Sequence, residues 1–232
     1  SGGGINVTVG GGYSQLVSGI YVSGSTSTNF SANGNLASGL IINNRGTLRV
    51  YSSGSASATQ INSGGNSFLV NGGIGIATQI SSSGAQYVSS GGIASGTQIG
   101  SGGFQNVNSG GLAFDTIISS GGAATVFAGG IASSTQISSG GTQNVNAGRA
   151  SSTIISSGGT EQIFASGIAS GTQISSGGTQ ALYSSGSAVS TVVSAGGLLT
   201  LNQAGASATE IVLSSGGGIN VTVGGGYSQL VS

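Results

Sequence analysis

The sequence predicts an all-β protein, a right-handed parallel β-helix (β-solenoid) of roughly twelve coils with about 19 residues in each. Three observations support this fold: a motif that recurs at a nearly constant period, glycine pairs at fixed places in each copy, and short β-branched segments between them. The motif Thr-Gln-Ile occurs at 59–61, 78–80, 97–99, 135–137 and 172–174. Related tripeptides fill the gaps: Thr116-Ile117-Ile118, Thr153-Ile154-Ile155, Thr191-Val192-Val193 and Thr209-Glu210-Ile211.

Each copy contains two glycine-rich positions that are expected to be turns. Ser-Gly-Gly follows the Thr-x-Ile motif, for example at 101–103, and a second glycine pair comes later in the copy, for example at 110–111. Glycine adopts positive φ without a steric penalty, so we expect these pairs to provide the left-handed turn conformations. The segments between them, such as 67–70 and 105–108, are short, partly alternating and rich in residues that favour strands.

The motif also predicts which side chains stack inside the solenoid. Residues two apart in a strand share a face, so the threonine and the last residue of the motif point together and the middle residue points away. We expect the last residues to form an interior column: Ile61, Ile80, Ile99, Ile118, Ile137, Ile155, Ile174, Val193 and Ile211. We expect the middle residues to form an exterior ladder: Gln60, Gln79, Gln98, Ile117, Gln136, Ile154, Gln173, Val192 and Glu210.

Composition excludes several classes of function. The 232 residues include three Lys or Arg, three Asp or Glu, no histidine and no cysteine, and the net charge is zero. Such a chain lacks the clustered basic residues that nucleic-acid binding needs, so no nucleic-acid partner is expected. No run of 18 apolar residues is present that would predict a membrane-spanning helix.

Catalysis and metal binding have little support in the sequence. A serine nucleophile normally needs a histidine base, and the chain has none. The carboxylates Asp115, Glu161 and Glu210 fall in different columns and separate coils of the predicted helix, so we expect solvated surface groups and no glycosidase pair. The turns have serine where calcium-binding β-roll repeats have aspartate, so no metal or cofactor is expected.

The chain is predicted to be a single β-helix with three parts. Residues 34–213 contain the regular repeats, residues 1–33 are expected to form irregular first coils, and residues 214–232 contain a copy of 1–18. Residues 215–232 are identical to 1–18, whereas the internal copies share only a skeleton, which indicates a duplication or an artificial fusion. The first residue is not methionine, and we expect the chain to be a piece of a longer one.

The repeat resembles a known family. The segment Gly-Gly-Ile-Ala-Ser-Gly-Thr-Gln-Ile-x-Ser-Gly-Gly at 91–103, nearly repeated at 129–141, is similar to the passenger repeats of self-associating autotransporter adhesins of the AIDA and TibA type. The resemblance implies a right-handed parallel β-helix on a Gram-negative cell surface, exported through a carboxy-terminal translocator that is absent from this sequence. It implies a non-enzymatic adhesin that mediates bacterial aggregation, biofilm formation and host-cell adhesion. The implied partners are other copies on neighbouring cells, the host-cell surface, and a cytoplasmic heptosyltransferase that O-heptosylates the passenger.

The serines beside the glycine pairs are the candidate acceptors of this sugar. A transferase needs a hydroxyl on an open loop, and neighbouring glycines leave room for its approach, whereas a structural serine would bond the local backbone of its turn. The first candidates are Ser63, Ser101, Ser120, Ser139, Ser157 and Ser176 on one edge, and Ser90 and Ser109 on the other. Their neighbours Ser119, Ser138, Ser156 and Ser175 are possible substitutes.

Two other functions stay open at this point. One is a polysaccharide-active β-helix enzyme, against which the scarcity of ionisable side chains argues. The other is an ice-binding solenoid, which would need threonine pairs that point outward, although the motif pairs its threonine with an apolar residue on the same face.

Overall fold

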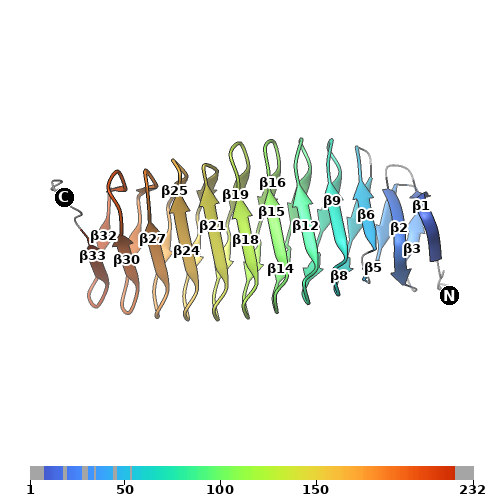
Figure 1. Cartoon of the computed structure of the whole chain (residues 1–232). Helices are drawn as coiled ribbons and strands as arrows, with labels where there is room; N and C mark the ends of the chain where they lie inside the picture. The colour runs from blue at the N-terminus through green and yellow to red at the C-terminus, as the bar shows by residue number, and fades with distance from the viewer. Residues whose placement is uncertain are drawn as a thin grey trace.

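The computed structural model describes residues 8–17, 20–27, 31–33, 35–43, 46–52 and 54–222. The described chain contains strands and no helix, and its coils stack side by side into an elongated rod (Figure 1). Each coil contributes one strand to each of three sheets, which we call sheets A, B and C. Residues 1–7 and 223–232, which belong to the two identical end segments, lie outside the described residues.

The strands of each sheet have similar lengths. Sheet A contains β6 (Thr47–Val50), β9 (Asn66–Leu69), β12 (Ala85–Val88), β15 (Phe104–Val107), β18 (Ala123–Val126), β21 (Thr142–Asn146), β24 (Thr160–Phe164), β27 (Thr179–Leu182), β30 (Leu198–Leu201) and β33 (Gly218–Val221). Sheet B contains β5 (Ile41–Ile42), β8 (Gln60–Ile61), β11 (Gln79–Ile80), β14 (Gln98–Ile99), β17 (Ile117–Ile118), β20 (Gln136–Ile137), β23 (Ile154–Ile155), β26 (Gln173–Ile174), β29 (Val192–Val193) and β32 (Val212–Leu213). Sheet C contains β4 (Leu36–Ser38), β7 (Ser55–Ser57), β10 (Ile74–Ile76), β13 (Ile93–Ser95), β16 (Leu112–Phe114), β19 (Ile131–Ser133), β22 (Arg149–Ser151), β25 (Ile168–Ser170), β28 (Ser187–Val189) and β31 (Ser207–Thr209).

The predicted parallel β-helix is confirmed. Consecutive coils pair in parallel with a register of about 19 residues, for example Gln79 with Gln98 and Ile80 with Ile99. Ten coils lie between residues 36 and 221, fewer than the roughly twelve expected from the length, because the described first strands are not coils.

Antiparallel strands cover the N-terminal edge of the rod (Figure 1). β1 (Thr8–Val17) pairs with β2 (Ile20–Ser27), and β2 runs antiparallel along both β6 and β5. β3 (Ser31–Asn33) pairs antiparallel with β4. The first strand of each sheet is therefore not an open edge, and open edges are what allow a sheet to extend onto another chain.

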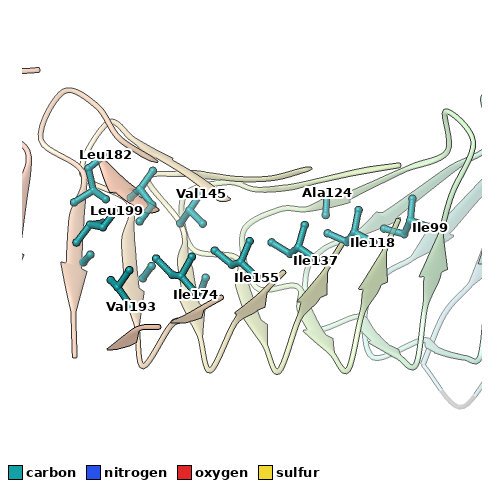
Figure 2. Packing of buried hydrophobic residues seen from close by; sticks show 14 of the residues in the cluster. Ile99, Ile118, Ala124, Ile137, Val145, Ile155, Ile174, Leu182, Val193 and Leu199 are labelled. Carbon is teal, nitrogen blue, oxygen red and sulfur yellow. The ribbon is translucent and has the colours of Figure 1, made fainter. Parts of the chain in front are cut away.

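The interior is a set of side-chain columns, one member per coil. The predicted isoleucine column lies inside, where Figure 2 shows its members from Ile99 to Val193 one after another. The side chains from Ile80 to Val193 in this column are at most 1% exposed. Sheet C adds a column of small residues, mostly alanine, such as Ala94 and Ala113, and sheet A adds Val88, Val107 and their equivalents. The motif threonines also point inward, as predicted, from Thr59 to Thr191.

The prediction that Ile211 and Glu210 end the two sheet B columns is wrong. Val193 pairs with Leu213 and Val192 with Val212, so Leu213 and Val212 take the places assigned to Ile211 and Glu210. The step is 20 residues here, because the loop between Leu201 and Ser207 is one residue longer than the one between Leu182 and Ser187. Thr209 instead belongs to sheet C, where it pairs with Val189.

The two glycines of each pair have different roles. In the turn Ser138–Gly141 the left-handed residues are Ser139 (φ 50°) and Gly140 (φ 76°), and the Gly141 N–H donates to the Ser138 carbonyl at 2.8 Å. This is the φ pattern of a type I′ turn, so the serine and the first glycine adopt the positive φ. A Cβ on Gly141 would lie 2.5 Å from the Ile118 carbonyl oxygen of the preceding coil. The second glycine is therefore required by the close stacking of the coils.

A third corner has no glycine pair and was not identified from the sequence. One left-handed residue joins each sheet C strand to the next sheet B strand, for example Ala77 (φ 50°), Asp115 (φ 53°) and Ser152 (φ 54°). Its N–H donates to the following coil, as from Asp115 to the Ser133 carbonyl at 3.0 Å. The three corners together give each coil its three sides.

We expect Gly141→Ala to be more destabilising than Gly140→Ala. An alanine at 140 has no atom within 4 Å of its Cβ. Its only cost is the left-handed backbone conformation, with φ near 76°, which is about 1 kcal/mol. An alanine at 141 overlaps the backbone of the preceding coil and is expected to cost about 2–3 kcal/mol. Urea denaturation of the two variants measures the difference. Equal destabilisation by both would contradict the stacking role of the second glycine.

Candidate functional site

The first eight candidate serines lie on the edges of the rod, at the turns between sheets. Ser63, Ser101, Ser120, Ser139, Ser157 and Ser176 lie between sheets B and A, and Ser90 and Ser109 lie between sheets A and C. All eight are exposed. All except Ser109 have positive φ, between 45° and 50°. The repeat therefore places exposed hydroxyl groups in rows along two edges.

The hydroxyl groups of these serines are free within the described chain. Their backbone groups bond the neighbouring coil, as from the Ser101 N–H to the Ser120 carbonyl at 3.0 Å and from the Ser157 N–H to the Ser176 carbonyl at 2.8 Å. None of the eight hydroxyls donates or accepts a hydrogen bond with the residues that the structure describes. The structural role considered for them, a bond to the local backbone, is absent from these turns.

The substitute candidates differ in exposure from the first eight. Ser119, Ser138, Ser156 and Ser175 open their turns and are only half-buried, with the Ser138 carbonyl accepting the turn hydrogen bond. By contrast, the motif threonines Thr97 and Thr172, each directly before a strand of sheet B, are 0% exposed. The turn serines are therefore accessible to solvent, whereas these threonines are not.

The three carboxylates are not arranged as a glycosidase pair. Asp115 and Glu210 occupy equivalent left-handed corners, which corrects the prediction that all three lie in different columns, but five coil steps separate them. Glu161 is 0% exposed, so the expectation of a solvated surface group is wrong for this residue. A glycosidase needs two carboxyl groups within about 10 Å on either side of its substrate. The arrangement does not provide such a pair.

The motif threonines are also not arranged for ice binding. The motif threonines from Thr59 to Thr191 are at most 2% exposed, so they cannot form an outward threonine array. No group of three or more potential metal-ligating side chains occurs in the described part of the chain. A search of the described residues for a helix long and apolar enough to cross a membrane found none.

Glu161 belongs to a buried polar column that the sequence analysis missed. Sheet A places the side chains of Gln86, Gln105, Gln143, Glu161 and Gln180 inside, each at most 1% exposed. The signal was present in the sequence, because each of these residues precedes a buried Val, Ile or Leu by two positions and so shares its face. Hydrogen bonds to the buried threonines compensate for the burial, such as Gln86 Nε2 to Thr78 Oγ1 at 3.2 Å.

Four neutral groups donate hydrogen bonds to the Glu161 carboxyl. Oε1 accepts from Gln143 Nε2 and Thr153 Oγ1, both at 3.0 Å. Oε2 accepts from Gln180 Nε2 at 2.8 Å and from Thr172 Oγ1 at 3.3 Å. Burial raises the pKa of Glu161, and these four hydrogen bonds lower the pKa by less than burial raises it.

The outer face of sheet C carries a cluster of apolar side chains. The first outward positions of four consecutive strands are Ile74, Ile93, Leu112 and Ile131, and the second are Ile76, Ser95, Phe114 and Ser133. We call these eight residues the sheet C face. Ile76 is 43% exposed and Ile131 is 39% exposed. Sheet B differs, because its outward positions are mostly glutamine, interrupted by apolar residues such as Ile117 and Ile154.

The outer face of sheet A carries a short aromatic stack. Arg49 lies 4.6 Å from the ring centre of Phe68, and Phe68 stacks on Tyr87 with ring centres 4.9 Å apart. These residues occupy one column in consecutive coils, because Arg49 pairs with Phe68 and Phe68 with Tyr87. The stack is a contact between consecutive coils along the rod. Arg49 and Tyr87 cover the ring of Phe68, so that ring is not available to stack on a ligand.

Comparisons with known proteins agree with this architecture. The profile of the AIDA family, described as "Adhesin of bacterial autotransporter system, probable stalk", matches residues 23–84, 80–141 and 127–178. Among solved structures, the chain is similar to the crystal structure of a TibA fragment that is hyper-glycosylated by TibC, with a TM-score of 0.80 and 38% identity. That match covers 82% of this chain and 69% of the other. None of the curated proteins matches.

The family matches run through residues 23–178 and so cover more than half of the 232 residues. The stacked coils, the period and the scarcity of charge all agree with a stalk. The chain belongs to the AIDA family of bacterial autotransporter adhesins, as a passenger segment of the AIDA and TibA type that acts at the cell surface or outside the cell.

Proposed function

We propose that this chain is an adhesin stalk that is O-heptosylated on its turn serines and holds bacteria together by contacts between copies. The rows of exposed, unbonded serine hydroxyls support the first part. The apolar sheet C face supports the second part. Aggregation and biofilm formation follow from contacts between stalks on neighbouring cells, and host-cell adhesion is the further activity that the family resemblance implies.

The geometry of the turns suits a glycosyl acceptor. Ser139 is exposed at its type I′ turn, and a Cβ on the neighbouring Gly140 would have no atom within 4 Å. The similar TibA fragment is hyper-glycosylated by TibC. We infer that a transferase of the same kind, a cytoplasmic heptosyltransferase, modifies the turn serines of this chain before export.

We expect peptide mass spectrometry, after co-expression with such a heptosyltransferase, to find sugar on exposed turn serines. Ser139→Ala is expected to lose the modification at its turn without unfolding, because alanine already adopts the same φ at Ala58 and Ala77. The buried Thr97 and Thr172 serve as internal controls and should be unmodified. Sugar only on strand residues, or no sugar at all, would contradict the proposal.

The sheet C face fits a second copy of itself. In the second column, large and small side chains alternate from coil to coil: Ile76, Ser95, Phe114, Ser133. Consider a copy that runs in the opposite direction, related by a two-fold axis parallel to the strands and midway between β13 and β16. This operation places Ile76 opposite Ser133 and Phe114 opposite Ser95, so each large side chain meets a small one. Such an interface is isologous and closed, as in most symmetric dimers.

The chemistry of the face also favours association between copies. None of its eight residues is charged, so no repulsion between like charges opposes contact. Contiguous exposed apolar side chains commonly mark interaction sites. A single contact over four coils is small, but display of many stalks on one cell multiplies weak contacts into stable adhesion.

We expect the double variant Ile76→Asp/Ile131→Asp to abolish the clumping of cells that display the stalk. The matched control is Ile117→Asp/Ile154→Asp, which changes the same residue type at similar exposure, 38% and 44%, on sheet B. The control cells should settle like wild type, since the added charges lie outside the sheet C face. Settling assays and sedimentation velocity of the purified chain measure the effect.

Two outcomes would overturn this interface. If the sheet B variant alone disperses the cells, or if both variants still clump, the contact lies elsewhere on the rod. Circular dichroism of each variant verifies that the coils remain folded, since these isoleucines project outward from the sheets.

A further inference from the structure

Three of the four buried glutamines point in the same direction along the rod. Gln105 donates from Nε2 to Gln86 Oε1 of the preceding coil at 2.8 Å, and its Oε1 accepts from Thr116 of the following coil at 3.4 Å. Each regular glutamine also donates to the threonine eight residues before it, as Gln105 does to Thr97 at 3.2 Å. Gln86 and Gln180 have the same orientation as Gln105: each donates to the threonine eight residues before it and accepts from the threonine eleven residues after it.

Gln143 has the opposite orientation. Its Nε2 donates forward to Glu161 Oε1 at 3.0 Å, and its Oε1 is buried without a hydrogen-bond partner. The threonine eight residues before it, Thr135, has a buried Oγ1 that is also without a partner. Buried unsatisfied polar atoms are rare in folded proteins, and two of them in one repeat unit need an explanation. The reversed amide explains both, because it turns Nε2 away from Thr135.

A third buried polar atom without a hydrogen-bond partner lies in another coil, and it shows that a motif threonine depends on the glutamine eight residues after it. Thr59 Oγ1 is buried without a partner. The residue eight positions after it is Ser67, whose side chain is shorter than that of glutamine. Where a glutamine is present in its regular orientation, at 86, 105 and 180, the threonine eight positions before it is bonded.

We propose that Glu161 is a neutral carboxylic acid in the folded stalk. Its hydroxyl donates a hydrogen bond to Gln143 Oε1, and the side-chain amide of Gln143 is rotated so that Nε2 faces Thr135. Glu161 then takes the role of a glutamine in the column. Its hydroxyl donates to the preceding coil, as Nε2 does elsewhere, and its Oε2 still accepts from Gln180 and Thr172. Both unpartnered atoms gain a partner, and the amides of Gln143 and Gln180 then point the same way as those of Gln86 and Gln105, on the other side of the buried Ala124.

The surroundings of Glu161 offer no compensation for a negative charge. The side chain is 0% exposed, and its four hydrogen-bond donors are neutral amides and hydroxyls. The other inward residues of its own coil are Ala150, Thr153, Ile155 and Ile163, and those of the two adjacent coils are also uncharged. Arg149 belongs to the same coil, but it lies at an outward position of β22 and is exposed. A buried carboxylate without a cation is strongly disfavoured relative to the neutral acid.

The neutral acid makes the stability of these coils depend on pH. Burial raises the pKa of Glu161 above that of the unfolded chain. The stabilisation is therefore complete below the unfolded pKa and is lost as the pH rises through the folded pKa. Between these two pKa values the unfolding equilibrium constant increases by up to about tenfold for each pH unit. The coils around Glu161 are therefore expected to become less stable as the pH of the surroundings rises.

Glu161→Gln is the direct test, because an amide has the shape of the acid and exchanges no proton. Thermal unfolding of wild type and E161Q is compared from below the ordinary pKa of glutamate to alkaline pH. We expect wild type to lose stability relative to E161Q as the pH rises. The control Glu210→Gln, at an exposed corner, should follow wild type. Infrared difference spectra of folded wild type against E161Q should show the carbonyl band of a protonated carboxyl group at neutral pH.

The opposite results would overturn the proposal. If the wild-type and E161Q profiles run parallel, the pKa of Glu161 is the same in the folded and unfolded chain. If wild type gains stability relative to E161Q as the pH rises, or if E161Q does not fold, the column requires an ionised carboxylate. A carboxylate band in place of the protonated carbonyl band at neutral pH would show directly that Glu161 is ionised in the folded chain.

Discussion

Contact between consecutive coils at the spacing of a β-sheet is the constraint on which the rest of this structure depends. The backbone hydrogen bonds continue from the strands around the corners, as from the Gly110 N–H to the Gly129 carbonyl at 2.9 Å. Because the coils are this close, the second glycine of each pair has no room for a Cβ, and a Cβ on Gly111 would lie 2.2 Å from the Val88 carbonyl oxygen. The glycine content is therefore a consequence of stacking as much as of turning.

The same stacking places like residues on like residues and makes each coil dependent on its neighbours. An apolar column tolerates this directly, since isoleucine packs on isoleucine over many coils. A polar column tolerates it only if each side chain both donates and accepts along the rod, which an amide does and a carboxylate does not. Glu161 interrupts such a column, and a proton on its carboxyl group restores the pattern. The turns face no such demand, which leaves their serine hydroxyls open to solvent.

Much of the fold was predictable from the sequence because a period repeats the same evidence in every copy. The threonine and isoleucine positions followed from alternation within one tripeptide, as Thr97 and Ile99 show. The single-residue corner at Ala77 was not predictable, since it has no fixed residue type and no glycine pair. The buried glutamines were missed because amides suggest solvent, although Gln105 stands two residues before the buried Val107. The shift at Leu213 depends on one inserted residue that the repeat does not mark.

The register between coils is tested most directly by cysteine cross-linking, because the natural chain contains no cysteine. Gln79→Cys and Gln98→Cys lie at paired positions on the outer face of sheet B in adjacent coils. Paired positions of neighbouring strands are about 4.8 Å apart, within the Cα separation of a disulfide. We predict that this double variant forms an intramolecular disulfide on mild oxidation, while Gln79→Cys with Ile117→Cys, two coils apart, does not. Cross-linking of the distant pair, or failure of the adjacent pair in the folded chain, would contradict the stacked register.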